Sequence, residues 1–306
     1  MSIHIHTPLI ESLPLSALND GQVYLKMEAM QACASFKARG IGHTCTEKMK
    51  AGAKRFVCAS GGNAGLAVAY SGRKLGIPSC VVVPKSTGVH ARELIEAEGA
   101  EVIVHGESLQ EAHNYALSLV DEDSAYIHPY DDPLVWEGHA TLVDELVEAN
   151  YKPDMIVLSV GGGGLMVGVI QGLRKYGWQD IPILAVETIG ADSLYQSIQA
   201  GERITLSKIN SSANTLGAKQ ICERAFNDYF EHPVESIRVT DREALEACEH
   251  FVDDHRVLVE LACGAALAPV YAGHPSLENK QNVLVIVCGG AGITLEQLAE
   301  YDHTLD

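Results

Sequence analysis

One lysine and three glycine-rich segments are the features of this sequence whose residue types and spacing could do chemistry. The glycine-rich segments cover residues 60–65, 161–164 and 288–292, and each follows a short apolar run that predicts a strand. A glycine turn at the start of a helix exposes backbone N–H groups, which favour an anion. Ligands of open α/β sheets also lie at this carboxyl edge of the strands. The three segments therefore predict anion-binding turns.

The four consecutive glycines at 161–164 are the strongest candidate for a phosphate site, because the backbone can close around a phosphate without a Cβ in the way. A tight turn without a ligand is the alternative. No Gly-Lys-Ser/Thr follows the run, and no Gly-x-Gly-x-x-Gly follows the first strand, which argues against a nucleotide site. In residues 60–65, backbone donors, a hydroxyl and an amide could hold a carboxylate. The alternative there is that Ser60 or Asn63 caps the following helix.

Lys37 follows Phe36 in the segment 35–40. A lysine side chain is usually solvated surface. A desolvated amine near other positive groups loses its proton more readily, however, and becomes a nucleophile that can form a Schiff base. The sequence alone leaves both interpretations of Lys37 open.

Alternation of short β-branched runs with amphipathic stretches predicts an α/β protein with mainly parallel sheets covered by helices. With 306 residues, 47% of them hydrophobic, the chain is long enough to bury a large core, divided into two lobes. The predicted strands are 23–27, 55–59, 79–84, 101–104, 155–160, 183–187 and 283–288. The predicted helices are 62–76, 87–98, 107–121, 138–150, 164–176, 241–255, 262–272 and 294–301.

Composition excludes several classes of partner. The net charge of -18 disfavours binding to nucleic acid and to anionic lipid, both of which require clustered Lys and Arg. The apolar stretches are shorter than the roughly 20 residues of a membrane helix, and the N-terminus lacks a signal-peptide pattern, so we expect a cytoplasmic protein. The eight cysteines contain no Cys-x-x-Cys pair, and most of them are expected to be reduced core residues.

Taken together and in this order, residues 35–37, 60–65, 161–164 and 287–290 resemble the fold-type II (tryptophan synthase beta-like) pyridoxal-phosphate enzymes. More narrowly, the chain resembles the serine dehydratase and serine dehydratase-like group, which residues 37–43, 131–140 and 262–268 support. The resemblance implies two open, twisted, mostly parallel sheets flanked by helices in two lobes. It also implies a large cofactor-binding domain of residues 1–33 plus 139–306, a small domain of residues 34–138, and a homodimer.

The resemblance assigns a role to each motif. Lys37 would bind pyridoxal 5'-phosphate as a Schiff base and, with Ser60, form the catalytic pair. Phe36 would pack on the ring of the cofactor, Asn63 would bind the ring hydroxyl, and Cys288 would face the ring nitrogen. The phosphate would be held by Gly161, Gly162, Gly163 and Gly164, and the substrate by Ser60, Gly61, Gly62, Asn63 and Ala64.

The group also binds a monovalent cation, K+, and five residues match that region: Glu187, Ala191, Ser193, Leu216 and Ala218. A glutamate that ends a strand is more often a helix cap or an ion-pair partner, and this alternative stays open for Glu187.

The resemblance implies elimination of water and ammonia from L-serine, giving pyruvate, or from L-threonine, giving 2-oxobutyrate. Residues 32–34, Thr215, Leu261 and the pair at 291–292 depart from the usual pattern of the group and leave the substrate open. The alternatives on the same fold are serine racemase, threonine deaminase, β-substituted aspartate dehydratase and β-replacement synthase. A non-catalytic amino-acid sensor is the alternative of a different class.

Overall fold

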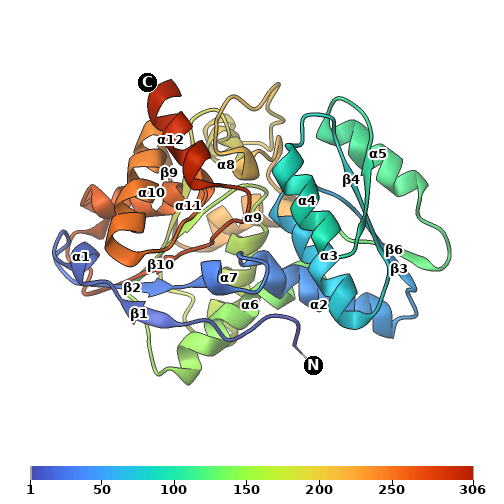
Figure 1. Cartoon of the computed structure of the whole chain (residues 1–306). Coiled ribbons are helices and arrows are strands. Elements are labelled where there is room, and N and C mark those ends of the chain that lie inside the picture. The colour runs from blue at the N-terminus through green and yellow to red at the C-terminus, as the bar shows by residue number, and fades with distance from the viewer. Residues whose placement is uncertain (1, 306) are drawn as a thin grey trace.

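Two mainly parallel sheets form the framework of the computed structural model, which describes residues 2–305 (Figure 1). The larger sheet contains, in spatial order, β1 (Leu9–Glu11), β2 (Gln22–Lys26), β10 (Asn282–Ile286), β7 (Met155–Ser159), β8 (Ile183–Thr188) and β9 (Val234–Val239). Only β1 pairs antiparallel with its neighbour. The smaller sheet contains β5 (Glu101–Val104), β4 (Ser79–Val83), β3 (Arg55–Ala59) and β6 (Ser124–Tyr126), all parallel.

Helices cover both sheets because the strands are apolar on both faces, as in β7 and β8, whose residues are all buried. The helices of the larger sheet are α1 (Leu13–Ser16), α6 (Pro133–Glu148), α7 (Gly164–Lys175), α8 (Ser193–Ala200), α9 (Glu223–Glu231), α10 (Asp241–His255), α11 (Leu261–Tyr271) and α12 (Leu295–Thr304). Those of the smaller sheet are α3 (Asn63–Leu75), α4 (Val89–Ala97) and α5 (Leu109–Ser118). We call the two assemblies the large lobe and the small lobe.

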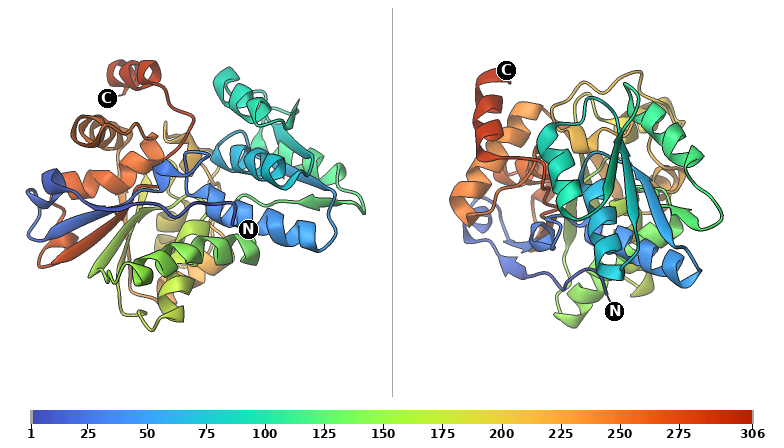
Figure 2. Two further views of the ribbon diagram at one scale, coloured as in Figure 1. Left: turned by 60° about the horizontal axis from the view of Figure 1, so that its bottom comes forward. Right: turned by 45° about the vertical axis from the view of Figure 1, so that its right-hand side comes forward.

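Helix α2 (Lys37–Lys50) lies where the two lobes meet, packed against α3 of the small lobe and α6 of the large lobe (Figure 2). Its first residue is Lys37. Helix α6 in turn packs against α7, so α6 connects α2 to the helices of the large lobe. Asp132 caps α6 by accepting a hydrogen bond from the Leu134 N–H, and Pro133 occupies the first turn, where its missing N–H costs nothing.

The predicted α/β class with two parallel sheets is confirmed, as are all seven predicted strands and all eight predicted helices, within a few residues except for α6, which begins at Pro133. Seven elements were not predicted: the short strands β1 and β6, strand β9, and helices α1, α2, α8 and α9.

The eight cysteines are buried free thiols, as expected. Among the helices of residues 2–305, none combines the length and apolar character that a membrane crossing requires. The domain boundaries at 33/34 and 138/139 stay a prediction.

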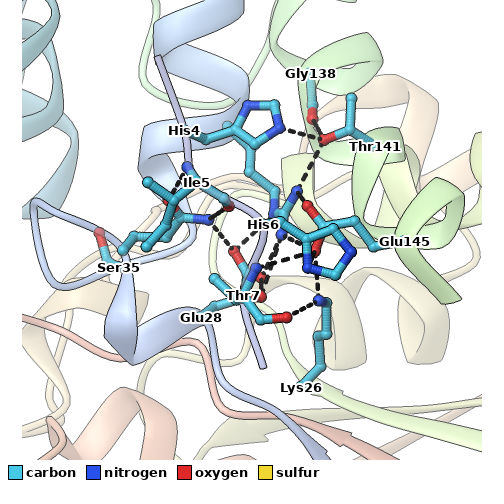
Figure 3. A network of polar contacts seen from close by, with 12 residues as sticks. His4, Ile5, His6, Thr7, Lys26, Glu28, Ser35, Gly138, Thr141 and Glu145 are labelled. Atoms are coloured by element: carbon cyan, nitrogen blue, oxygen red, sulfur yellow. Dashed lines mark hydrogen bonds and ion pairs between the residues drawn. The ribbon is translucent and has the colours of Figure 1, made fainter. Parts of the chain in front are cut away.

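A buried ionic cluster anchors α2 to the large lobe (Figure 3). It consists of Lys26, Glu28, Arg39 and Glu145, from β2, the turn after it, α2 and α6. The Arg39 guanidinium donates to both carboxylates: Nε is 2.7 Å from Glu28 Oε2, and Nη1 is 2.7 Å from Glu145 Oε1. Lys26 Nζ also donates to Glu145. Two positive and two negative charges therefore balance, which a buried cluster requires.

The N-terminal segment closes this cluster. Thr7 Oγ1 donates to Glu28 Oε1 at 2.6 Å, and Lys26 Nζ donates to the Thr7 carbonyl at 2.6 Å. Burial, with Arg39 adding to the effect, lowers the pKa of His4 to about 4. His4 is therefore neutral near pH 7 and leaves the charge balance of the cluster unchanged.

Replacing Glu145 by Gln should destabilise the protein by roughly 3–5 kcal/mol, because Lys26 and Arg39 would then lack a buried counter-charge. Urea unfolding measures the loss. The matched control is Glu148→Gln on the same helix, whose side chain is 69% exposed and lies 3.6 Å from His6 Nε2. This control should cost less than about 1 kcal/mol. Equal effects of the two changes would contradict the anchoring role.

Candidate active site

A cavity of about 450 Å³ lies between the two lobes. Its wall contains every residue that the sequence proposed for cofactor and substrate: Phe36, Lys37, Ser60, Gly61, Gly62, Asn63, Ala64, Gly161, Gly162, Gly163, Gly164 and Cys288. Three of the contributing segments follow the carboxyl ends of β3, β7 and β10, the edge at which parallel sheets bind ligands. The structure thus brings together motifs from widely separated parts of the chain, although their roles stay predictions.

Lys37 is placed by the contact between its own segment and the turn after β10. Phe36 N–H donates to the Cys288 carbonyl at 3.1 Å, and Ser35 forms an isolated bridge with Gly289. Gly289 has a φ of 89°, and a Cβ there would lie 2.2 Å from the Ala34 carbonyl oxygen. Only glycine allows this approach. The Lys37 amine points into the cavity wall, where Nζ donates to the Pro129 carbonyl at 2.5 Å.

The electrostatic surroundings of Lys37 favour a neutral amine. Loss of hydration in the cavity wall lowers the pKa of Lys37 to about 8, from a value of about 10.4 for a solvated lysine. Desolvation is the largest influence on this pKa; the Cys58 and Cys288 thiols oppose it, and burial raises the pKa of Cys58 to about 12, which keeps that thiol uncharged. A substantial fraction of the Lys37 amine is therefore nucleophilic at neutral to mildly alkaline pH.

The four-glycine turn joins β7 to α7 and has no room for side chains. A Cβ on Gly162 would lie 2.3 Å from the Tyr130 ring, and a Cβ on Gly163 would lie 2.4 Å from that of Ala225. Gly163 also has a φ of 91°, in the left-handed region. The turn therefore presents bare backbone to the cavity at the N-terminus of a twelve-residue helix, whose first N–H groups have no partner within the helix.

The 60–64 segment joins β3 to α3 and, like the four-glycine turn, contains a position without room for a side chain at the start of a helix. A Cβ on Gly61 would lie 2.3 Å from Thr87 Oγ1, so this position also excludes a side chain. The helix is capped by Gly62 without a side-chain hydrogen bond, and the alternative that Ser60 or Asn63 caps α3 is therefore wrong. Ser60 Oγ instead accepts from the Gly62 N–H at 3.4 Å, within the same turn.

Three residues of the cavity wall were not predicted: the carboxylate Glu260, Pro129, which contacts Lys37, and Tyr130. Glu260 accepts from Asn63 Nδ2 at 2.9 Å and from Thr215 Oγ1 at 2.7 Å. The signal for Glu260 was present, because it is the only charged residue in the apolar stretch 257–268. A charged residue in such a stretch is either paired or functional.

The five residues proposed for a cation divide into two groups. Leu216 and Ala218 lie in the cavity wall, whereas Glu187, Ala191 and Ser193 lie at the end of β8 and the start of α8. Glu187 accepts from the N–H groups of Leu194 and Tyr195, at 2.9 and 2.7 Å, so the helix-cap interpretation of Glu187 is confirmed. Burial raises the pKa of Glu187 to about 8, and the buried Ser193 hydroxyl has no hydrogen-bond partner. Within residues 2–305, no three His, Cys, Asp or Glu side chains are grouped as a metal site.

The amine of Lys37 should react with acetic anhydride with a midpoint near pH 8, because only the neutral amine is nucleophilic and its fraction rises through the pKa. The measurement is competitive acetylation across pH, read by peptide mass spectrometry, on protein freed of bound small molecules by unfolding and refolding. Solvated lysines of the same sample should titrate about two pH units higher. A midpoint above pH 10 for Lys37 would contradict the desolvated environment.

Comparison with known proteins agrees with this geometry. Residues 2–289 match the family described as "Pyridoxal-phosphate dependent enzyme". The L-serine dehydratase/L-threonine deaminase of Mus musculus is 49% identical over 308 residues, covering 97% of this chain and 94% of the mouse protein.

Two solved structures extend the comparison. The fungal L-serine ammonia-lyase from Rhizomucor miehei superimposes with a TM-score of 0.94 at 36% identity, covering 100% of both chains. The maize serine racemase superimposes with a TM-score of 0.89 at 26% identity, covering 98% of this chain and 93% of the racemase. The predicted fold-type II architecture is confirmed by these similarities.

Proposed function

Because this chain belongs to the pyridoxal-phosphate-dependent enzyme family, we propose that it is an L-serine ammonia-lyase that binds its cofactor covalently through Lys37. One observation carries the proposal: the desolvated amine of Lys37 and the bare four-glycine turn line the same cavity. An aldehyde that carries a phosphate needs both of these groups. The products would be pyruvate and ammonia from L-serine, and 2-oxobutyrate and ammonia from L-threonine.

The residues present fit the cofactor. The turn at 161–164 would hold the phosphate through its N–H groups at the start of α7, and its close contacts with Tyr130 and Ala225 require glycine at positions 162 and 163. Phe36 would flank the ring, and Cys288 would face the ring nitrogen. Cys288 is buried in the cavity wall, 3.5 Å from Ser159 Oγ. When bound, the cofactor supplies an electron sink that makes the α-proton of the substrate acidic.

The substrate carboxylate would be held by the segment 60–64 at the start of α3, where backbone donors and the Ser60 hydroxyl converge. The amine of Lys37, once displaced by the substrate amine, would take the α-proton at Nζ. The lowered pKa of Lys37 suits a base that must be neutral near pH 8. Enclosure between the lobes would limit the access of water while the β-hydroxyl departs.

Cys288 bears on the choice of reaction. Contacts with the Cys263 and Ser159 side chains lower the pKa of the Cys288 thiol, but in its protonated form this thiol cannot stabilise a positive charge on the ring nitrogen as a carboxylate does. Cys288 would then leave the bound cofactor a weaker electron sink, which would favour departure of a leaving group together with the α-proton over transamination. The thiol at this position therefore supports elimination rather than a reaction that requires a long-lived carbanion.

Replacing Lys37 by Ala should abolish the visible absorbance of the purified protein and reduce pyruvate formation from L-serine by at least about 10³-fold, because nucleophile and base are lost together. A lactate dehydrogenase-coupled assay measures pyruvate. The matched control is Lys50→Ala at the other end of α2, where Lys50 forms an exposed contact with Glu47. This control should keep colour and turnover. A coloured, active Lys37→Ala protein would refute the assignment.

The competing reactions can be separated by assay. Racemisation would give D-serine without net ammonia, β-replacement would require a second substrate, and a β-substituted aspartate dehydratase would release oxaloacetate. Threonine deaminase would favour 2-oxobutyrate over pyruvate. A non-catalytic sensor would bind the amino acid and release no product.

We also propose that a monovalent cation binds at Glu187, Ala191 and Ser193, with the carbonyls of Leu216 and Ala218. The proposal is supported by the complete burial of the Glu187 side chain, whose charged form a bound cation would stabilise, and by the buried Ser193 hydroxyl without a hydrogen-bond partner. Exchange of potassium for tetramethylammonium, which is too large for such a site, should lower turnover at least about 10-fold. This factor corresponds to a loss of about 1.4 kcal/mol of transition-state stabilisation. Equal turnover in both salts would contradict a cation site.

The homodimer and the cytoplasmic location stay predictions. Light scattering would test whether the protein is a homodimer.

A further inference from the structure

The carboxylate of Glu260 joins the two lobes at the edge of the cavity. It begins α11 of the large lobe, and its partner Asn63 begins α3 of the small lobe. Asn63 Nδ2 donates to Glu260 Oε2 at 2.9 Å, and the Ala291 N–H donates to Asn63 Oδ1 at 3.0 Å. Both ends of the Asn63 amide are therefore bound to the large lobe.

The large lobe is shaped around this carboxylate. The Gly292 N–H donates to Glu260 Oε1 at 2.7 Å, and Thr215 Oγ1 donates to Oε2 at 2.7 Å. A Cβ on Gly290, which has a φ of 128°, would lie 2.2 Å from Glu260 Cδ. The turn after β10 therefore accommodates the glutamate only because it carries no side chain at position 290.

The hydrogen bonds to the Glu260 carboxylate all come from donor groups. Burial raises the pKa of Glu260, whereas hydrogen bonds from Thr215, Gly292 and Asn63 oppose this change. Three donors shared between two oxygens occupy most of the lone-pair sites of the carboxylate and suit an acceptor. Glu260 is thus placed to orient other groups.

The Asn63 amide has one orientation in this network. If its oxygen and nitrogen were exchanged, the oxygen would face the Glu260 carboxylate, and the NH2 group would face the Ala291 N–H. Both contacts would be repulsive. Since one N–H of Nδ2 is donated to Glu260, the second N–H is left for the cavity that Asn63 lines.

We propose that Glu260 is a positioning residue, which fixes the Asn63 amide so that it presents an N–H to the ring oxygen of the cofactor. The inference rests on the proposed function, because it requires the cofactor to lie beside Asn63. Through its contact with Asn63 Nδ2, Glu260 also holds the 60–64 segment of the small lobe against the large lobe. Loss of the carboxylate would disturb the cofactor ring without touching Lys37 or the phosphate turn.

An exchange of donor and acceptor tests this role. In Glu260→Gln, one terminal atom becomes a donor, so the side chain cannot accept from both Gly292 and Asn63. In Asn63→Asp, two carboxylates face each other. In the double variant, the new amide at position 260 can accept from Gly292 and donate to the new carboxylate at position 63, so the contact between the lobes is restored. That carboxylate, however, has no N–H for the cofactor.

The expected result separates stability from positioning. The urea midpoint of the cofactor-free protein should fall in each single variant and recover in the double variant. The dissociation constant for pyridoxal phosphate, measured by absorbance, should rise about 10-fold in Glu260→Gln, which corresponds to about 1.4 kcal/mol. It should stay raised in the double variant. Glu278→Gln, an exposed change, should neither rescue Asn63→Asp nor weaken cofactor binding.

Three results would overturn the inference. The first is a urea midpoint of the double variant that falls by the sum of the two single-variant shifts, without recovery. The second is wild-type cofactor affinity in Glu260→Gln. The third is wild-type affinity in the double variant, which would show that Glu260 acts only as a contact between the lobes. A wild-type protein that does not bind pyridoxal phosphate overturns the proposed function, and this inference with it.

Discussion

The ion pairs of Arg39 are the interaction on which the rest of the active site depends. Arg39 and Lys37 are two positions apart at the start of α2, so they point to nearly opposite sides of the helix. Arg39 enters the buried ionic cluster of the large lobe, and Lys37 enters the cavity. Because a buried guanidinium cannot leave its carboxylates without a large penalty, α2 has one position against α6. That position sets the place of the Lys37 amine.

Each lobe contributes different residues to the cavity wall. The large lobe contributes the four-glycine turn and Cys288, from the ends of β7 and β10, while the small lobe contributes the 60–64 segment from the end of β3. Backbone donors at helix starts supply positive potential in a chain whose net charge is -18. Asn63 and Glu260 join the halves across the gap. Binding of anionic groups therefore depends on local geometry rather than on the overall charge.

Much of this arrangement could be predicted from the sequence, for physical reasons. Strands such as β7 and β8 are largely apolar runs because they are buried on both faces, and the glycine turns are recognisable because close backbone approaches require glycine. Helix α2 escaped prediction because residues 37–50 contain two glycines and few large apolar residues, so its helical state depends on packing against α3 and α6. Glu260 escaped because its function depends on partners at 63, 215 and 292, which only the folded chain brings together.

Reduction with borohydride followed by peptide mass mapping tests the central claim most directly. Borohydride fixes a pyridoxyl group to the lysine that carries the cofactor. The account predicts this mass on the peptide that contains Lys37 and on no other peptide of the protein. Labelling at a different lysine, or no labelling of a protein saturated with pyridoxal phosphate, would contradict the account.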